Sequence, residues 1–307
     1  MIDLGSIQAP IRRETVPSRD GTPIAVYVAG RGHHDLVLAP GLGANILCWK
    51  HVIEDFQGVY RMITWDPRGT YDSGTPRRDD DLDLPHHVQD LEAIVQAFHL
   101  QRFVLGGWSM GVQVSLEYTL RHAERVKALV LINGHYGHLL ADVLNLPGAD
   151  VLFRGAIVAL RAAMPLLQPV APSLFQASWM PALLAHTGVF KAPVPLFFPI
   201  LKGFGTLDFH RYLGMIARLD RHTTGPGLER IQVPTLITAG TRDFLTPPSV
   251  GREMQRRITG SRLVLLPGGT HYSMMELPRE LHAALEGFLQ EVDPASFAPI
   301  PRTVSHP

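Results

Sequence analysis

Short runs of apolar residues alternate along the chain with polar or glycine-rich segments. Within each run the apolar residues are continuous and do not alternate with polar ones. Continuous runs of this kind predict strands that are buried on both faces, as in a parallel sheet. The runs are residues 36–39, 62–65, 103–105, 128–132, 235–239 and 263–266.

Amphipathic stripes at helical spacing lie between several of these runs. Val88, Leu91 and Val95 fall on one face of a helix, and Asp83 before them is a candidate N-cap. A similar stripe covers residues 281–292. Alternating strands and helices predict an α/β fold: a doubly wound, mostly parallel sheet of about eight strands with right-handed crossovers.

The chain begins with the signature of a hairpin. Residues 11–16 and 23–28 alternate apolar and polar positions, and they flank the turn sequence Ser-Arg-Asp-Gly at residues 18–21. We therefore expect the sheet to begin with an antiparallel pair of strands.

The alternation of strands and helices stops between residues 135 and 227, where apolar helical segments are interrupted by many prolines. This segment predicts a helical cap inserted over the rim of the sheet. The expected organisation is an α/β core at residues 1–134 and 228–292, a cap at 135–227 and a proline-rich surface tail at 293–307.

Composition excludes several classes of protein. The 307 residues include 28 Lys and Arg and 28 Asp and Glu, so no basic field attracts a nucleic acid. The single cysteine, Cys48, excludes an intramolecular disulfide framework. The sequence shows neither a secretory signal pattern nor an apolar stretch long enough to be a transmembrane segment. We expect a cytoplasmic protein, and its charged content of 18% suggests an apolar surface or cleft.

One serine lies between two glycines directly after an apolar run. The segment Gly107-Trp108-Ser109-Met110-Gly111 precedes a helical pattern, so it predicts a strand-to-helix turn of the G-x-S-x-G type. Glycines on both sides allow a strained serine backbone and close contact with the neighbouring strand and helix. Ser109 is the candidate nucleophile, held at the carboxyl edge of the sheet and at a helix N-terminus that favours negative charge.

A serine hydroxyl becomes a nucleophile when an adjacent base accepts its proton. Among the 15 histidines, His271 lies on a glycine-rich loop after the last apolar run, at the same edge as Ser109. The later His282 belongs to the last helix. His271 is therefore the candidate base.

The acid that orients the histidine should also follow a strand. Asp243 comes just after residues 235–239 and is the candidate. The rival position follows residues 128–132, but Asn133 stands there and the next carboxylate is Asp142. Asp220 is the reserve candidate.

The loop Pro40-Gly-Leu-Gly-Ala44 follows the first parallel strand, and its glycines let the backbone approach a substrate carbonyl. The N–H groups of Leu42 and Met110 are the candidate donors to an oxyanion. The histidine pairs at 33–34 and 86–87 and the acidic run at 79–83 are read as solvated segments, because adjacent side chains point apart. We expect neither a metal nor a cofactor.

Five motifs follow one another along the chain: PGLG at 40–43, WDPRGTYDSG at 65–74, GWSMG at 107–111, AGTRD at 239–243 and GGTHY at 268–272. They occur in the order found in the α/β-hydrolase superfamily, and the chain resembles the members of that superfamily that carry a helical cap. By this resemblance Ser109, Asp243 and His271 would form a catalytic triad. The sequence departs from the family at Pro40, where most relatives have histidine, and at Tyr71 or Asp72, where many have glycine.

The resemblance also limits the chemistry. Epoxide hydrolases and haloalkane dehalogenases of this superfamily have aspartate as the nucleophile in this strand-to-helix turn, called the nucleophile elbow, whereas this chain has serine. We expect hydrolysis of a small carboxylic ester or lipid-like substrate through an acyl-enzyme, with an apolar acyl or alcohol group. The residues expected to contact it are Trp108, Phe175, Trp179 and Phe197.

Two alternatives stay open. The same triad serves acyl transfer, the opening of a lactone or thioester, carbon–carbon bond hydrolysis and haloperoxidase-like perhydrolysis in similar proteins. The second alternative is a receptor-like module that binds a ligand with little turnover.

Overall fold

One eight-stranded sheet forms the centre of the molecule. The computed structural model describes residues 4–142, 148–191 and 197–298. The strand order is β1-β2-β4-β3-β5-β6-β7-β8. β1 pairs antiparallel with β2 and β2 antiparallel with β4, whereas all other neighbours are parallel. This confirms the predicted fold class, including the N-terminal hairpin. The strands are β1 Ile11–Pro17, β2 Pro23–Ala29, β3 His34–Ala39, β4 Tyr60–Trp65, β5 Phe103–Trp108, β6 Val126–Ile132, β7 Thr235–Gly240 and β8 Arg262–Leu266.

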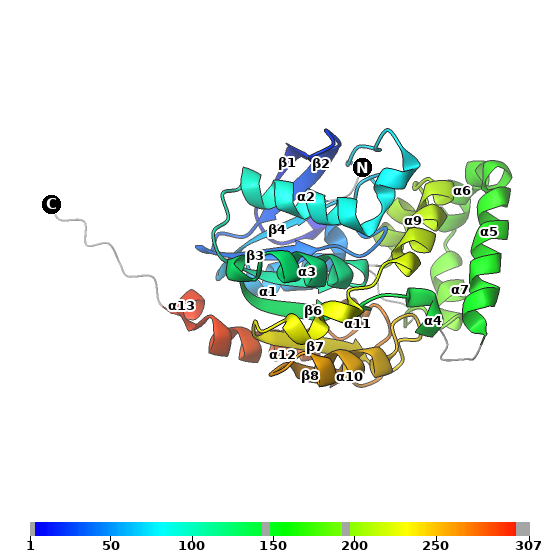
Figure 1. The fold of residues 1–307 in the computed structure, drawn as a ribbon. Helices are drawn as coiled ribbons and strands as arrows, with labels where there is room; N and C mark the ends of the chain where they lie inside the picture. The colour runs from blue at the N-terminus through cyan, green and yellow to red at the C-terminus, as the bar shows by residue number, and fades with distance from the viewer. Residues whose placement is uncertain (1–3, 143–147, 192–196, 299–307) are drawn as a thin grey trace.

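Helices cover both faces of this sheet (Figure 1). The apolar faces of α1, α11 and α12 share one buried core with the sheet, and those of α2, α3 and α10 share the other. Asp83 caps α2 as expected, because its side chain accepts a hydrogen bond from the His86 N–H. The bounds are α1 Lys50–Phe56, α2 Leu84–Ala97, α3 Met110–Arg121, α10 Pro248–Arg257, α11 Ser273–Glu276 and α12 Pro278–Val292.

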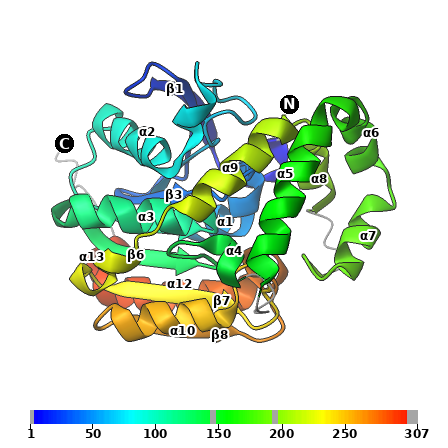
Figure 2. The ribbon, with the colours of Figure 1, turned by 45° about the vertical axis from the view of Figure 1, so that its right-hand side comes forward.

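A group of helices, here called the insertion, lies between β6 and β7. It projects from the edge of the sheet at which the carboxyl end of β6 lies (Figures 1 and 2). An isolated antiparallel bridge between Gly137 and Thr223 joins the two ends of the insertion. α5 and α9 lie side by side (Figure 2). The helices are α4 Leu139–Asp142, α5 Ala149–Leu167, α6 Ala171–Gln176, α7 Met180–His186, α8 Phe197–Phe204 and α9 Phe209–Arg221.

The end of the chain differs from the expected surface tail. α13, Pro294–Phe297, follows α12, and both Asp293 and Ser296 are buried. The Ser296 hydroxyl donates to the Tyr60 hydroxyl, and the Phe297 ring packs edge-on against the Tyr60 ring. Long-range contacts of this kind leave no periodic pattern in a proline-rich sequence. The part of the expected tail at residues 299–307 lies outside the described residues.

Candidate active site

The serine of the G-x-S-x-G turn is the single residue between β5 and α3. Its backbone has φ 56° and ψ −118°, a conformation that residues other than glycine seldom adopt. The flanking glycines are needed because of close backbone contacts. A Cβ at Gly107 would lie 2.2 Å from the Gly111 carbonyl oxygen, and one at Gly111 would lie 2.0 Å from the Ala39 carbonyl oxygen. Ser109 is therefore held in a strained turn between β3, β5 and α3.

A chain of hydrogen bonds joins the three candidate residues, which come from loops after three different strands. His271 Nε2 lies 2.9 Å from Ser109 Oγ, and His271 Nδ1 lies 3.0 Å from Asp243 Oδ2. Asp243 and His271 are buried, whereas Ser109 is partly exposed. The order hydroxyl, imidazole, carboxylate is the arrangement that allows a hydroxyl to lose its proton to an oriented imidazole.

The two carboxylate oxygens of Asp243 have different partners. Oδ1 accepts from the backbone N–H groups of Leu245 and Thr246 at 3.0 and 2.9 Å, which fixes the turn. Oδ2, the oxygen that faces His271, also accepts from the Thr246 hydroxyl at 2.6 Å and from Asn133 Nδ2 at 3.0 Å. Burial acts to raise the Asp243 pKa. The charge and hydrogen bond of His271 and the hydrogen bonds of Thr246 together lower that pKa by more than burial raises it, so the net shift is downward. The carboxylate therefore stays ionised beside the imidazole.

Asn133 is a part of this site that sequence reasoning did not assign. It follows β6 with φ 42°, and its side chain donates to Asp243 Oδ2 and, at 3.0 Å, to the Thr270 carbonyl oxygen. The Ser273 hydroxyl donates to its Oδ1. The available signal was an asparagine before a glycine at a strand end, because asparagine tolerates the left-handed conformation.

The loop before α1 contacts the serine. A Cβ on Gly41 would lie 3.2 Å from the Ser109 Cβ, so this backbone passes directly beside the nucleophile. Met110 is the first residue of α3, and its N–H has no intrahelical acceptor. The backbones that carry the Leu42 and Met110 N–H groups therefore flank Ser109. Their role as oxyanion donors stays a prediction.

A family departure noted in the sequence has a local physical basis. Tyr71 adopts φ 44°, the left-handed conformation that glycine accepts most readily. Its hydroxyl donates to the Gly43 carbonyl oxygen at 2.6 Å. The side chain thus ties the loop after β4 to the loop that carries Leu42.

The expected substrate-binding residues occupy different surroundings. Trp108 is buried, donates from Nε1 to the His271 carbonyl oxygen at 3.0 Å and packs its ring 5.5 Å from the imidazole. Phe197 stacks on Phe190 at 4.0 Å and lies edge-on to Tyr272, the neighbour of His271. Trp108 thus contacts His271 directly, whereas Phe197 contacts the adjacent Tyr272.

The other two lie further out in the insertion. Phe175 packs against Phe204 and Phe209, with ring centroids 5.5 and 5.4 Å away. Trp179 is 53% exposed just before α7. Substrate contact by these four residues stays a prediction.

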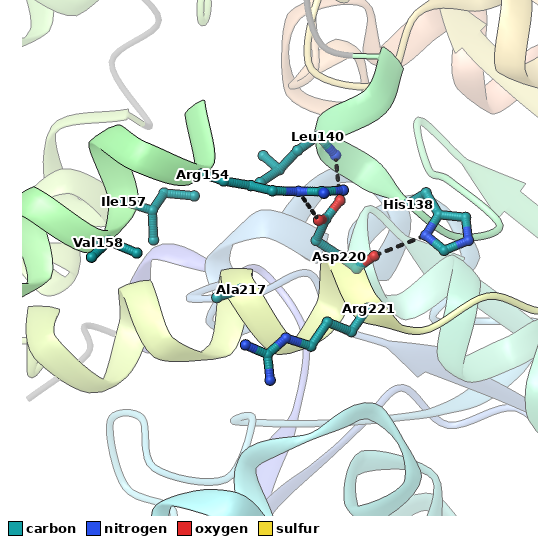
Figure 3. A pocket seen from close by; sticks show the side chains of 8 residues that line it. All are labelled: His138, Leu140, Arg154, Ile157, Val158, Ala217, Asp220 and Arg221. Atoms are coloured by element: carbon teal, nitrogen blue, oxygen red, sulfur yellow. Dashed lines mark hydrogen bonds and ion pairs between the residues drawn. The ribbon is translucent and has the colours of Figure 1, made fainter. Parts of the chain in front are cut away.

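The reserve acid has a structural role. Asp220 near the end of α9 accepts from the Leu140 N–H at 2.8 Å and from Arg154 Nε at 2.9 Å (Figure 3). Its own carbonyl oxygen lies 3.1 Å from His138 Nδ1. It therefore fastens α4 and α5 to α9, and Asp243 is the acid beside His271.

Within the described ranges, no group of three or more histidine, cysteine, aspartate or glutamate side chains is placed to hold a metal ion. Cys48 is buried, and burial raises its thiol pKa to about 12. It is therefore not a second nucleophile.

Comparison with known proteins places this geometry in a family. Residues 36–181 match the family described as "alpha/beta hydrolase fold", and residues 218–293 match the family described as "TAP-like protein". The putative carbamate hydrolase RutD of Klebsiella pneumoniae (strain 342) is 29% identical over 244 residues, covering 77% of this chain and 84% of its own. Epoxide hydrolase 3 of Xenopus tropicalis is 24% identical, covering 83% of this chain and 71% of its own.

A solved structure agrees with the fold. The esterase EaEST from Exiguobacterium antarcticum superposes with a TM-score of 0.73 at 24% identity, covering 91% of this chain and all of that chain. The family matches, the sheet order and the strained serine turn lead to one conclusion: the chain belongs to the α/β-hydrolase superfamily and is a hydrolase.

Proposed function

We propose that the protein hydrolyses carboxylic esters with an apolar acyl or alcohol group, using Ser109, His271 and Asp243 as a catalytic triad. The observation that carries this proposal is the hydrogen-bond chain from Ser109 Oγ through the imidazole to Asp243 Oδ2, at 2.9 and 3.0 Å. This chain supports removal of the serine proton during attack on a carbonyl.

The reaction has two steps. Ser109 Oγ attacks the ester carbonyl carbon while His271 Nε2 takes the hydroxyl proton, and the Leu42 and Met110 N–H groups stabilise the oxyanion. His271 then gives that proton to the departing alcohol, which leaves an acyl group on Ser109. Water attacks this acyl-enzyme with His271 taking its proton, the bond between the acyl carbon and Ser109 Oγ breaks, His271 returns the proton to Ser109 Oγ, and the acid product leaves. Asp243 keeps the imidazole in the required tautomer and stabilises its protonated form.

Preference for an apolar group rests on the aromatic side chains near the base. Tyr272 packs edge-on against His271, Phe197 packs edge-on against Tyr272, and Phe190 stacks on Phe197. Apolar walls with few polar groups are typical of sites for apolar ligands.

Carbamate hydrolysis is the second candidate, favoured by the similarity to the putative carbamate hydrolase of Klebsiella pneumoniae. A carbamate carbonyl is open to the same attack by Ser109. The relatives named epoxide hydrolase add less, because epoxide opening in this superfamily uses an elbow aspartate and this chain has serine.

A panel of p-nitrophenyl acetate, butyrate, octanoate and N-methylcarbamate tests these proposals, with Ser109→Ala as the control. We expect kcat/KM to rise from acetate to octanoate by about tenfold or more, because each added methylene buries apolar surface. Equal rates on acetate and octanoate would remove the apolar preference. Faster turnover of the carbamate would favour the second candidate, and ligand binding without turnover would favour a receptor-like module.

A further inference from the structure

One face of α5 is apolar although it faces outward. Four of its large side chains are 69–83% exposed: Val151, Leu152, Val158 and Leu166. Three small residues complete the same helical face, because all seven positions fall within about one third of a turn of the helix. The outer face of α5 is thus Val151, Leu152, Gly155, Val158, Ala159, Ala162 and Leu166, all exposed.

The opposite face of α5 packs on the protein. Ile157 and Arg161 are partly buried on the side toward α9, and Met164 is buried. The two arginines of α5 make ion pairs inward, Arg154 with Asp220 at 2.9 Å and Arg161 with Asp79 at 3.7 Å. A surface helix of a globular protein ordinarily turns its polar side chains outward. Here apolar side chains occupy the outward face as well as the inward one, and exposed apolar patches of this kind are typical of contact surfaces.

Charge indicates the kind of partner. Residues 151–207 contain no aspartate or glutamate, and their four Lys and Arg are Arg154, Arg161, Lys191 and Lys202. The whole chain carries equal numbers of acidic and basic residues, so this balance is a local feature. Arg154 and Arg161 are offset by their inward partners Asp220 and Asp79, so the feature that complements an anionic lipid surface is an apolar face on a segment free of acidic side chains.

A cavity of about 480 Å³ adjoins the outer face. Val158 belongs both to the outer face and to the cavity, and Ile157 and Ala217 extend its apolar wall. Arg154 and Arg221 also line the cavity, as does Asp220, which pairs with Arg154 at 2.9 Å. The guanidinium available to a phosphate is therefore that of Arg221, which points away from Asp220 in Figure 3. Apolar walls beside guanidinium groups fit the glycerol region and phosphate of a phospholipid.

We propose that the outer face of α5 docks on the surface of an anionic phospholipid bilayer, with Arg221 beside the headgroup phosphates. None of the helices in the described ranges combines the length and apolarity that crossing a bilayer requires. α5 would therefore lie along the interface, with its apolar side chains among the upper acyl chains. This inference goes beyond the proposed ester hydrolysis and does not depend on it.

Vesicle co-sedimentation tests the proposal with the full chain. The vesicles are ether-linked phosphatidylcholine, with or without about one third ether-linked phosphatidylglycerol, because ether lipids are not ester substrates. We expect binding to the anionic vesicles, at least tenfold weaker binding for Leu152→Asp/Leu166→Asp, and a smaller loss for Arg221→Glu that is confined to anionic vesicles.

Matched controls make the same changes in charge elsewhere. Ala283→Asp/Gln290→Asp adds two acids to exposed positions of α12, and Arg256→Glu reverses a 71% exposed arginine on α10. These controls should bind as the unchanged chain does. Turnover of soluble p-nitrophenyl acetate by each variant verifies folding and, by itself, says nothing for or against docking.

Three results would overturn the proposal. They are no binding to either vesicle, equal binding to neutral and anionic vesicles, and binding that the α5 and α12 variants weaken alike. Analytical ultracentrifugation supplies a fourth: a dimer that Leu152→Asp/Leu166→Asp dissociates, without vesicle binding, would assign the outer face to a second copy of the chain.

Discussion

At the scale of single residues, the strained backbone of Ser109 explains how the hydroxyl reaches its base. A φ of 56° turns the side chain out of the line of β5, and the N–H of Ser109 is held by the Ile132 carbonyl oxygen at 3.1 Å. The hydroxyl then lies within hydrogen-bond distance of His271. The cost of this conformation, about 1–3 kcal/mol, is met by the packed strand and helix on either side.

Asp243 should be needed for the rate of catalysis. Asp243→Asn keeps the side-chain shape but removes the charge that stabilises a protonated imidazole, and it favours the wrong tautomer. We expect kcat on a p-nitrophenyl ester to fall by about 10²–10⁴. Asp220→Asn is the matched control and should keep kcat within about threefold, because Asp220 only fastens the insertion. Near-full activity of Asp243→Asn would show that another group is the acid.

Asn133 should act by positioning Asp243 and keeping it ionised. Asn133→Asp replaces a donor 3.0 Å from Asp243 Oδ2 with a second carboxylate. Like charges raise each other's pKa, so the Asp243 pKa should rise. We expect the acid limb of the kcat/KM profile to move to higher pH by about one unit, with partial recovery of activity above it. An unchanged pH profile would leave Asn133 with a structural role alone.

Asp66 should make global stability depend on pH. Its burial raises the side-chain pKa to about 7, from an ordinary value of 3.8. Below both values the group is protonated in both states. As the pH rises from about 4 to 7 the unfolded chain ionises first, so the folded state loses up to about 4 kcal/mol.

Asp66→Asn removes this ionisation. In urea unfolding at pH 4, 5.5 and 7, the free energy of unfolding of Asp66→Asn relative to the unchanged chain should therefore rise with pH. A constant difference across that range would mean that Asp66 is ionised throughout.

At the scale of elements, the contact between α3 and β3 fixes the serine turn. A Cβ at Gly111 would lie 2.0 Å from the Ala39 carbonyl oxygen, which is backbone and has no rotamer with which to move away. We expect Gly111→Ala to lower the free energy of unfolding by about 3 kcal/mol or more. Thermal unfolding followed by circular dichroism measures this.

Gly287 in α12 is the matched comparison. Nothing lies within 4 Å of a Cβ at that position. Gly287→Ala should therefore raise stability by about 0.5–1 kcal/mol, because alanine loses less conformational freedom in a helix. Equal effects of the two substitutions would contradict the packing described for the serine turn.

Some elements could be predicted from the sequence and others could not. Strands such as β6 and β7 are continuous apolar runs, and α2 carries both an apolar stripe and a cap, so local pattern was sufficient. α13 could not be predicted, because it depends on the Tyr60 ring from a distant strand. Asn133 was missed because its role depends on Asp243, which is 110 positions away in the chain.

At the scale of the whole molecule, the parallel sheet explains why the candidate site was readable from the sequence. Parallel strands bring their carboxyl ends to one edge, so the residues after β5, β7 and β8 meet there. This topology brings Ser109, Asp243 and His271 together although the first and last are 162 positions apart.

The positions of the apolar residues in the insertion were harder to predict from the sequence. From the sequence, Phe175, Trp179 and Phe197 of this segment are expected to contact the substrate, whereas the structure places its apolar residues in several different surroundings. Phe197 is buried near the base, whereas Trp179 and the outer face of α5 are exposed. Apolar content alone does not tell which face of a helix is turned toward the protein when its outward face is apolar as well.

The most direct test of the central claim is the mass of the protein during turnover. The protein is mixed with p-nitrophenyl octanoate, quenched in acid within milliseconds to seconds and analysed by intact-mass and peptide mass spectrometry. We predict a transient octanoyl adduct on the peptide that contains Ser109, longer-lived in His271→Ala if it forms there and absent from Ser109→Ala. Steady turnover by the Ser109→Ala variant, or an adduct on another residue, would contradict the account.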